Sequence, residues 1–429
     1  MKMELATIPA GMQTAAFLPG RGVLRSVPEL LRTFFPGRKP WIIADENTWQ
    51  VAGKTLADSL KKEGTAAIDP YIFPGTPRLH PLYDTSRMLA DRMPENCVPV
   101  AVGSGVINDI VKCASGMKKI RYCCVATACS VDGYTASGSS MLVDGSKKTV
   151  PCPAPYAICA DSEIMETAPP EMFAAGYADL LAKVTGGADW LIADAMEMEP
   201  VRQDVWDLVQ TNLRQQIADP GNMTPVFHGL AASGYAMQLY LDSRPASGCE
   251  HLFSHVWEME NLQFNGEDVS HGFKVGVGTL AATLLFQYII DHDFDELIPR
   301  MKAPLTPEER QQEVAFLARR GCYGTLPEDN TRKKYLTPEE TLRKREKIRA
   351  VWPELQKRLQ KQIIPFPELR QMLQKAGCPT TPAEIGLDRE QFLNVIPMAQ
   401  TIRVRYTVLD LLYECGLLDD AGKNHEVML

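Results

Sequence analysis

The sequence lacks the features that mark several large classes of protein. Positive charge is not in excess: 45 Lys and Arg residues stand against 53 Asp and Glu residues, so no nucleic-acid surface is expected. The 11 cysteines include no CxxC pair, and we interpret them as reduced thiols of a cytoplasmic protein. The most apolar stretch, residues 273–290, contains Lys274 and Gln287, and the amino terminus has no signal-peptide core. We therefore expect no secretion and no membrane partner, and small molecules as ligands.

The first third of the sequence alternates short apolar runs with segments of helical period. We predict strands at residues 41–45, 66–73, 97–103 and 122–127, and amphipathic helices in the first two intervals between them. Alternation of this kind indicates a parallel sheet covered by helices, which is a nucleotide-binding class of fold. A hairpin is predicted at residues 139–150, with Asp144-Gly145 as its turn.

From about residue 167, long helical patterns replace the β-rich runs. Thr306, Thr337 and Thr381 are each followed by proline and then, at the third position, by glutamate, which predicts three capped helix starts. The charged stretch from 339 to 361 is interpreted as an exposed helix face. We predict an α/β domain over residues 1–166 and an all-helical domain over residues 167–429.

Residues 100–112 join a predicted strand to a helix that begins near Asn108 or Asp109. Between them, Gly103-Ser104-Gly105 would let backbone amides approach a pyrophosphate, whose charge the helix dipole favours. An ordinary strand-to-helix turn explains these residues equally well, because the third glycine of the GxGxxG fingerprint is absent.

Residues 125–138 combine a strand end with small and hydroxylated side chains. Thr127, Ser130 and Ser137 could donate hydrogen bonds to phosphate or ribose, and Asp132 could accept one from a substrate hydroxyl. The alternative is a serine-rich loop whose aspartate caps a turn.

Three of the seven histidines, His251, His255 and His271, lie within about twenty residues of one another. On a helix, His251 and His255 project from one face, the spacing that zinc-binding helices use. Core histidines without a metal remain an alternative.

Asp179 lies in a predicted helix over residues 169–190, on one face with Gly176 and Lys183. An aspartate among leucines and alanines is costly to bury without a cation, although a surface position would avoid that cost. One Asp with two or three His suits zinc, iron, nickel or cobalt with an open coordination position.

Six motifs, in this order, carry a family resemblance: GSGVIND, TACSVDGY, DGSKKT, AAGYADLLAK, SGCEHLFSHVWEM and HGFKVGVG. Together they resemble the sn-glycerol-1-phosphate dehydrogenase family, including its bacterial AraM-type members. That family belongs to the iron-containing alcohol dehydrogenase and dehydroquinate synthase-like superfamily. The resemblance covers residues 40–290, and residues 402–420 are similar to the family's carboxy-terminal helix. It implies a dinucleotide-binding α/β domain followed by an all-helical metal-binding domain.

The resemblance also implies roles for individual residues. Asp179, His251 and His271 match the metal ligands, while His255 and Asp132 match substrate-contacting positions, with His255 also a proton carrier. The positions that hold NAD or NADP match Asp45, Gly103, Ser104, Gly105, Val106, Ile107, Asn108, Thr127 and Ser130. Where the family often has a serine four residues after the aspartate, this sequence has Ala136, followed by Ser137.

The activity implied is metal-dependent hydride transfer from NADH or NADPH to dihydroxyacetone phosphate, which gives sn-glycerol 1-phosphate. Zinc or nickel is the expected metal, with iron or cobalt as alternatives, and a homodimer or larger assembly is expected. Lys147 and Lys148 are candidates for the substrate phosphate, or else exposed hairpin lysines. The rival functions are a polyol dehydrogenase of glycerol dehydrogenase type, a reductase of another phosphorylated ketose, a dehydroquinate synthase-like lyase and a non-catalytic binding protein.

Overall fold

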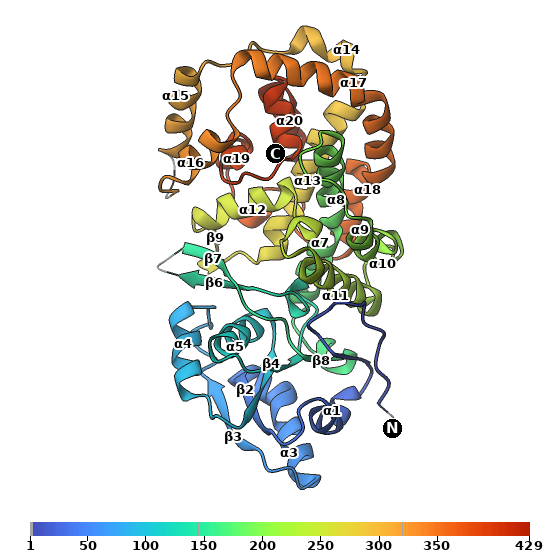
Figure 1. Cartoon of the computed structure of the whole chain (residues 1–429), viewed down its shortest axis with the longest axis vertical. Coiled ribbons are helices and arrows are strands. Elements are labelled where there is room, and N and C mark those ends of the chain that lie inside the picture. Colours follow the sequence, from blue (N-terminus) through green and yellow to red (C-terminus); the bar gives the residue numbers. More distant parts are fainter. Residues whose placement is uncertain (1–2, 144–145, 320, 322) are drawn as a thin grey trace. The chain divides into compact units, whose positions relative to one another are not determined.

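The computed structural model describes residues 3–143, 146–319, 321 and 323–429 (Figure 1). Contacts between residues divide the chain into two compact units. Unit 1 consists of Met1–Gly176 and Gln215–Asp242, and unit 2 consists of Tyr177–Arg214 and Ser243–Leu429. The sequence did not indicate that residues 215–242 return to unit 1. The predicted domain boundary between residues 166 and 167 stays a prediction, because compact contact groups do not establish which segments fold independently.

Unit 1 is built on a six-stranded parallel sheet, which confirms the predicted α/β class. Its strands follow the order β1-β8-β5-β4-β2-β3. They are β1 (Ala16–Gly20), β2 (Lys39–Asp45), β3 (Ile68–Phe73), β4 (Cys97–Gly103), β5 (Cys123–Ala126) and β8 (Ala157–Asp161). The four predicted strands are present, whereas β1 and β8 were missed. Both are five residues long, and β1 contains a proline, which an edge strand tolerates.

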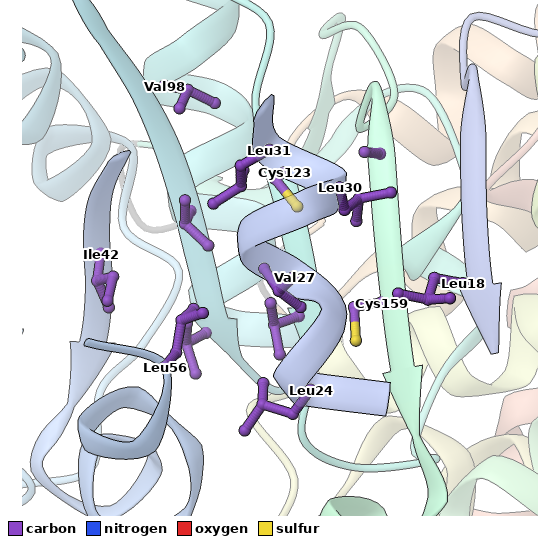
Figure 2. Packing of buried hydrophobic residues seen from close by; sticks show 14 of the residues in the cluster. Leu18, Leu24, Val27, Leu30, Leu31, Ile42, Leu56, Val98, Cys123 and Cys159 are labelled. Carbon is purple, nitrogen blue, oxygen red and sulfur yellow. The ribbon is translucent and has the colours of Figure 1, made fainter. Parts of the chain in front are cut away.

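One face of this sheet carries the main apolar cluster of unit 1. Helix α1 (Val27–Phe34) places Val27, Leu30 and Leu31 on one side, at the three- and four-residue spacing of an amphipathic helix. Figure 2 shows them beside side chains of neighbouring strands, among them Cys123 and Cys159. Helix α3 (Lys54–Lys62) adds Leu56, and all of these side chains are buried.

The chain reverses direction along the sheet between β2 and β4. The connection from β2 through α3 leads outward to β3, whereas the connection from β4 through α5 (Gly105–Lys118) leads to β5 on the other side. Right-handed crossovers therefore place α3 and α5 on opposite faces. In open α/β sheets, ligands bind beyond the carboxyl ends of the strands at such a point. Asp45 ends β2 there, and Gly103 ends β4.

Shorter elements complete unit 1. The predicted hairpin is present as β6 (Ser139–Val143) paired antiparallel with β7 (Ser146–Val150), and its predicted turn, Asp144-Gly145, lies outside the described residues. The helix predicted after β2 is α2 (Glu46–Thr48), a π-helical turn and α3, and the next predicted helix is α4 (Tyr83–Arg92). The remaining helices are α6 (Ser162–Met165) and α11 (Met223–Tyr240), while α7 (Pro170–Leu181) continues into unit 2.

Within its described residues, unit 2 has helices and one short hairpin, β9 (Gln263–Phe264) with β10 (Glu267–Asp268). Around the candidate site lie α8 (Lys183–Ala195), α12 (Cys249–Met259) and α13 (His271–Ile290). The single helix predicted over residues 169–190 is interrupted between α7 and α8 at Ala182. The other helices are α9 (Gln203–Gln210), α10 (Leu213–Gln216), α14 (Phe294–Leu297), α15 (Pro307–Ala318), α16 (Leu326–Lys334), α17 (Pro338–Gln362), α18 (Phe366–Lys375), α19 (Arg389–Thr401), α20 (Val408–Glu414) and α21 (Leu418–Gly422).

Two of the three predicted helix caps are confirmed. Thr306 and Thr337 each form a reciprocal capping box at the start of α15 and α17. The helix start predicted at Thr381 is wrong, because only a 3-10 turn, Ala383–Ile385, follows it. The left-handed backbone of Gly386 (φ 80°) ends that turn after three residues.

Helix α13 is long and apolar enough to cross a membrane by length and composition. Its most apolar 18-residue window is nevertheless 89% buried inside the structure. Burial of this extent is the property of a core helix in a globular protein. Glycines make that packing close: a Cβ at Gly278 would lie 2.5 Å from the carbonyl oxygen of Glu250 on α12.

Candidate metal centre and dinucleotide-binding loops

His251 is held in one orientation by the residue before it. The Nδ1 atom of His251 lies 2.7 Å from Oε1 of Glu250, whose other oxygen accepts a hydrogen bond of 2.9 Å from the Thr185 hydroxyl. Burial alone would raise the pKa of Glu250, but its contact with His251 lowers it, so the carboxylate is ionised. An ionised acceptor favours a proton on Nδ1 and directs Nε2 outward as a potential metal ligand.

Asp179 lies buried beside the Nε2 edge of the His251 ring. Its Oδ1 is 3.6 Å from Nε2 of His251 and accepts a 2.8 Å hydrogen bond from Nζ of Lys183, a fully buried residue. Burial would raise the pKa of Asp179, yet the Lys183 ammonium and the neighbouring histidines hold it below its ordinary value. Burial and the Lys183 ammonium act to lower the pKa of His251, but its hydrogen bonds with Asp179 and Glu250 raise it above its ordinary value. The aspartate therefore presents negative charge in an apolar interior.

The structure brings Asp179, His251 and His271 together. One ligand atom from each lies within 4.8 Å of the other two, and the rings of His251 and His271 are 5.4 Å apart between centroids. This spacing, with one carboxylate and two imidazoles, fits a divalent cation that retains an open position. The three residues come from α7, α12 and α13, so only the folded chain assembles them.

Glu258 contacts both of the other histidines, His255 and His271. Its Oε1 lies 3.0 Å from Nδ1 of His271 and 3.4 Å from Nζ of Lys274, while its Oε2 lies 3.2 Å from Nδ1 of His255. Its side chain is 8% exposed, compared with 29% for His255. The arrangement directs Nε2 of His271 toward the ligand cluster and leaves the His255 ring partly accessible.

Sequence reasoning missed Glu250 and Glu258. Both had a detectable signal: Glu250 adjoins His251, and Glu258 lies three residues after His255 on the same helix. Carboxylates commonly orient metal-binding histidines through the second ring nitrogen. A search for acidic residues around the histidines would have found both.

The loop after β4 has the form expected of a phosphate-binding turn. Ser104 is the N-cap of α5 with extended backbone and makes no side-chain cap hydrogen bond. A Cβ at Gly103 would lie 2.5 Å from Cβ of Ile107, so only glycine fits under that side chain. Helix α5 begins at Gly105, three to four residues before the predicted start near Asn108 or Asp109. Its first backbone N–H groups have no partner within the helix and can serve an anion.

The next two buried side chains, Ile107 and Asn108, pack or form hydrogen bonds inside unit 1. Ile107 is buried, and buried Asn108 donates to the Gly133 carbonyl at 3.3 Å and accepts from the Tyr122 hydroxyl at 3.0 Å. Dinucleotide contacts from Ile107 and Asn108 would therefore come from the backbone. Val106 is half-buried.

The loop after β5 is fixed from two sides. Nζ of fully buried Lys112 donates to the carbonyl oxygens of Gly133 and Gly138, at 2.8 and 3.0 Å. Ser233 of α11 donates to Oδ2 of Asp132 at 3.0 Å. Lys112 and Ser233 were also missed, because their contacts span 21 or more positions in the sequence. They hold a rigid, half-buried Asp132 carboxylate.

The other predicted contacts on this loop differ in accessibility. Thr127 and Ser130 are buried, and the Ser130 hydroxyl lies 3.4 Å from that of Tyr134. Ala136 is buried, whereas Ser137 is half-buried. The hydroxyl of Ser137 is therefore more accessible to a ligand than a hydroxyl at position 136 would be.

Asp45 and Lys148 belong to other elements of unit 1. Asp45 is the N-cap of α2, with Oδ1 accepting from the Thr48 amide at 2.8 Å. Lys148 is exposed on β7, and the side chain of Lys147 lies outside the described ones.

Comparison with known proteins places the chain among metal-dependent dehydrogenases. Residues 19–169 match the family model for iron-containing alcohol dehydrogenase. The chain is 31% identical over 396 residues to a glycerol-1-phosphate dehydrogenase [NAD(P)+] of Geobacillus thermodenitrificans, covering 89% of this chain and 88% of that protein. An archaeal protein of the same name, from Methanosarcina mazei, is 28% identical and covers 68% of this chain and 82% of its own length.

Solved structures confirm the fold class. Glycerol dehydrogenase from Schizosaccharomyces pombe superposes with a TM-score of 0.59 over 100% of this chain and 92% of its own, at 14% identity. An iron-containing alcohol dehydrogenase from Thermococcus thioreducens gives a TM-score of 0.53, covering 97% of this chain and 98% of its own, at 14% identity. At such identities the similarity concerns the fold alone.

Proposed function

This chain belongs to the glycerol-1-phosphate dehydrogenase family, and we propose that it interconverts dihydroxyacetone phosphate and sn-glycerol 1-phosphate. It is an NAD(P)-dependent oxidoreductase that acts on CH–OH. Within that activity, the convergence of Asp179, His251 and His271 carries the proposal for the reaction centre. The family predicted from the six sequence motifs is confirmed.

We propose that these three side chains hold one divalent cation, zinc or nickel in the first instance and iron or cobalt as alternatives. When bound, such a cation acts as a Lewis acid toward the substrate oxygen. Asp179 supplies the negative charge, and Glu250 and Glu258 present the two imidazoles with Nδ1 turned away from the metal position.

His255 is proposed as the group that carries the proton to or from the substrate oxygen. Its ring lies 6.4 and 6.5 Å, between centroids, from those of His251 and His271, and Glu258 orients it through Nδ1. Asp132, fixed by Ser233, is proposed to accept a hydrogen bond from a substrate hydroxyl. The substrate phosphate needs cationic or amide donors, and Lys147 and Lys148 remain the proposed pair.

The dinucleotide is proposed to bind at the carboxyl ends of β2 and β4. The reversal of chain direction between these strands, the glycine-lined turn and the unpaired amides at the start of α5 support this site. Bound NADH or NADPH supplies the hydride. Thr127, Ser130 and Ser137 are proposed as further donors, and Asp45 as a partner of the adenine ribose.

We further propose a cytoplasmic homodimer or larger assembly. The buried α13 and ten described cysteines without a disulfide agree with a reduced, non-membrane setting. Sedimentation at several concentrations tests the assembly, and a single species of 47.6 kDa would contradict it.

Loss of NADH absorbance tests the function. Protein is stripped with a chelator, reloaded with zinc, nickel, iron or cobalt, and given dihydroxyacetone phosphate or unphosphorylated dihydroxyacetone. Metal-dependent turnover that strongly favours the phosphate ester is expected. Equal rates on both would indicate a polyol dehydrogenase, and silence with every metal would exclude this substrate. NAD that is required but not consumed with a phosphorylated ketose would indicate a lyase.

A further inference from the structure

Unit 2 contains a cavity of about 420 Å³ among its carboxy-terminal helices. Its walls come from α15, α16, α17, α19, α20 and α21, and from loops that include residues 302–305. No residue of this wall belongs to the proposed metal, substrate or dinucleotide sites. A volume of this size lies within the range of pockets for small metabolites.

The wall carries more positive than negative charge. Six lining residues are Lys or Arg and four are Asp or Glu, an excess of two positive charges. Three of the cations are deeply placed and paired: Arg310 with Glu313, Lys334 with Asp410 and Lys344 with Glu414, at 2.5, 2.6 and 2.7 Å. Such pairing offsets the cost of burying charge and fixes the wall in one arrangement.

Two other cations supply the excess. Arg345 donates to the backbone carbonyl oxygens of Glu414 and Lys302, at 2.7 and 2.8 Å. Within the described part of the chain, neither Arg345 nor exposed Lys333 forms an ion pair. A guanidinium held by neutral acceptors keeps its full charge for an anion, and its planar fork suits a phosphate.

The cavity also offers apolar and aromatic surface. Lys344 lies 4.3 Å from the ring centroid of Tyr406, and the guanidinium of Arg310 lies 4.1 Å from that of Tyr413. Pro304, Leu305, Leu336 and Val404 line the same space. A ligand with only charged groups would leave this surface without a partner.

Two buried hydroxyl oxygens in the wall, those of Thr331 and Tyr335, have no hydrogen-bond partner among the described residues. Thr331 of α16 lines the cavity, is 8% exposed, and its Oγ1 has no partner among the described residues. An unsatisfied buried hydroxyl is destabilising, so native structures usually satisfy it with a ligand or water. A ligand oxygen in the cavity would accept this hydrogen bond.

From these observations we infer that the cavity is a second ligand site, which binds a small phosphate ester with an aromatic or apolar portion. Arg345 and Lys333 bind the phosphate, Thr331 donates to a ligand oxygen, and the tyrosines with their apolar neighbours contact the organic part. The inference rests on the cavity alone and does not depend on the proposed reaction.

Calorimetric titration of the metal-loaded protein with phenyl phosphate tests the inference, with inorganic phosphate and phenol as comparators. Phenyl phosphate is expected to bind more tightly than either fragment. Arg345→Gln and Lys333→Gln should each weaken binding about tenfold, as expected for loss of a charge-assisted contact. Arg343→Gln is the matched control, since Arg343 lies on the same helix, pairs with Glu339 and is 67% exposed. Its affinity should equal that of the unaltered protein.

Thr331→Val separates binding from folding. It removes a hydroxyl without a partner and keeps the shape, so thermal stability should be unchanged or higher while phenyl phosphate binds several-fold more weakly. Absence of binding at millimolar phenyl phosphate would overturn the inference. So would affinity that survives both Arg345→Gln and Lys333→Gln, because that ligand would occupy another site, such as the metal centre.

Discussion

The Nδ1 atom of His251 lies 2.7 Å from Oε1 of the preceding residue, Glu250, and both side chains are buried. This contact leaves Nε2 as the nitrogen that faces Asp179. Glu250→Gln should therefore lower metal affinity about 10- to 100-fold, because a neutral amide no longer favours the Nδ1-protonated ring. Metal content after dialysis against graded chelator measures it. Glu171→Gln, on the exposed part of α7, is the control and should retain metal.

Glu258 and His255 are predicted to have separable effects. His255→Ala should retain about one metal per chain and lose turnover, since the proposed proton carrier is gone while the ligands remain. Glu258→Gln should lower both metal affinity and kcat, because it contacts His271 as well as His255. Elemental analysis beside steady-state rates distinguishes them. Loss of metal from His255→Ala would instead identify His255 as a ligand.

Ser104→Asp is expected to separate stability from cofactor binding. Aspartate is a good N-cap and favours the helix dipole, so the melting temperature should hold or rise. Its negative charge at the start of α5 should weaken NADH binding tenfold or more by repelling the pyrophosphate. Fluorescence titration with NADH measures the affinity. Ser104→Asn, an uncharged cap, should bind NADH nearly normally, and equal affinity of both variants would contradict the phosphate site.

His425 should make the protein less stable in mild acid. Burial lowers its pKa to about 4, against an ordinary value of 6.5, so the unfolded chain binds the proton more readily between these values. His425 therefore does not lower the free energy of unfolding above pH 6.5. As the pH drops from 6.5 toward 4, that free energy falls, by about 3 kcal/mol in total from this residue. Urea unfolding at several pH values measures the slope. His425→Leu should reduce it, while His80→Gln, at an exposed position, should leave it unchanged.

Local patterns predicted the central strands, several helices and two caps, because each depends on neighbours within a few residues. The strands β1 and β8 escaped because five-residue strands carry little periodicity. The cap expected at Thr381 failed because Gly386 ends the turn. The family resemblance supplied the roles of Asp179, His251 and His271, and the structure shows that folding brings them together.

Residues that orient other residues were the least predictable. Lys112 and Ser233 act through contacts with residues 21 to 101 positions away, which no local pattern reveals. The carboxy-terminal cavity is of the same kind, since its wall combines residues from six helices. By contrast, Glu250 and Glu258 adjoin the histidine motif and could have been found from the sequence.

The most direct test of the metal proposal is anomalous diffraction from crystals of zinc-reconstituted protein, collected on both sides of the zinc edge. One peak per chain is predicted, within bonding distance of an Asp179 carboxylate oxygen and Nε2 of His251 and His271, with Nδ1 of each histidine still facing Glu250 or Glu258. A peak bound by other residues, or none at full zinc occupancy in solution, would contradict it.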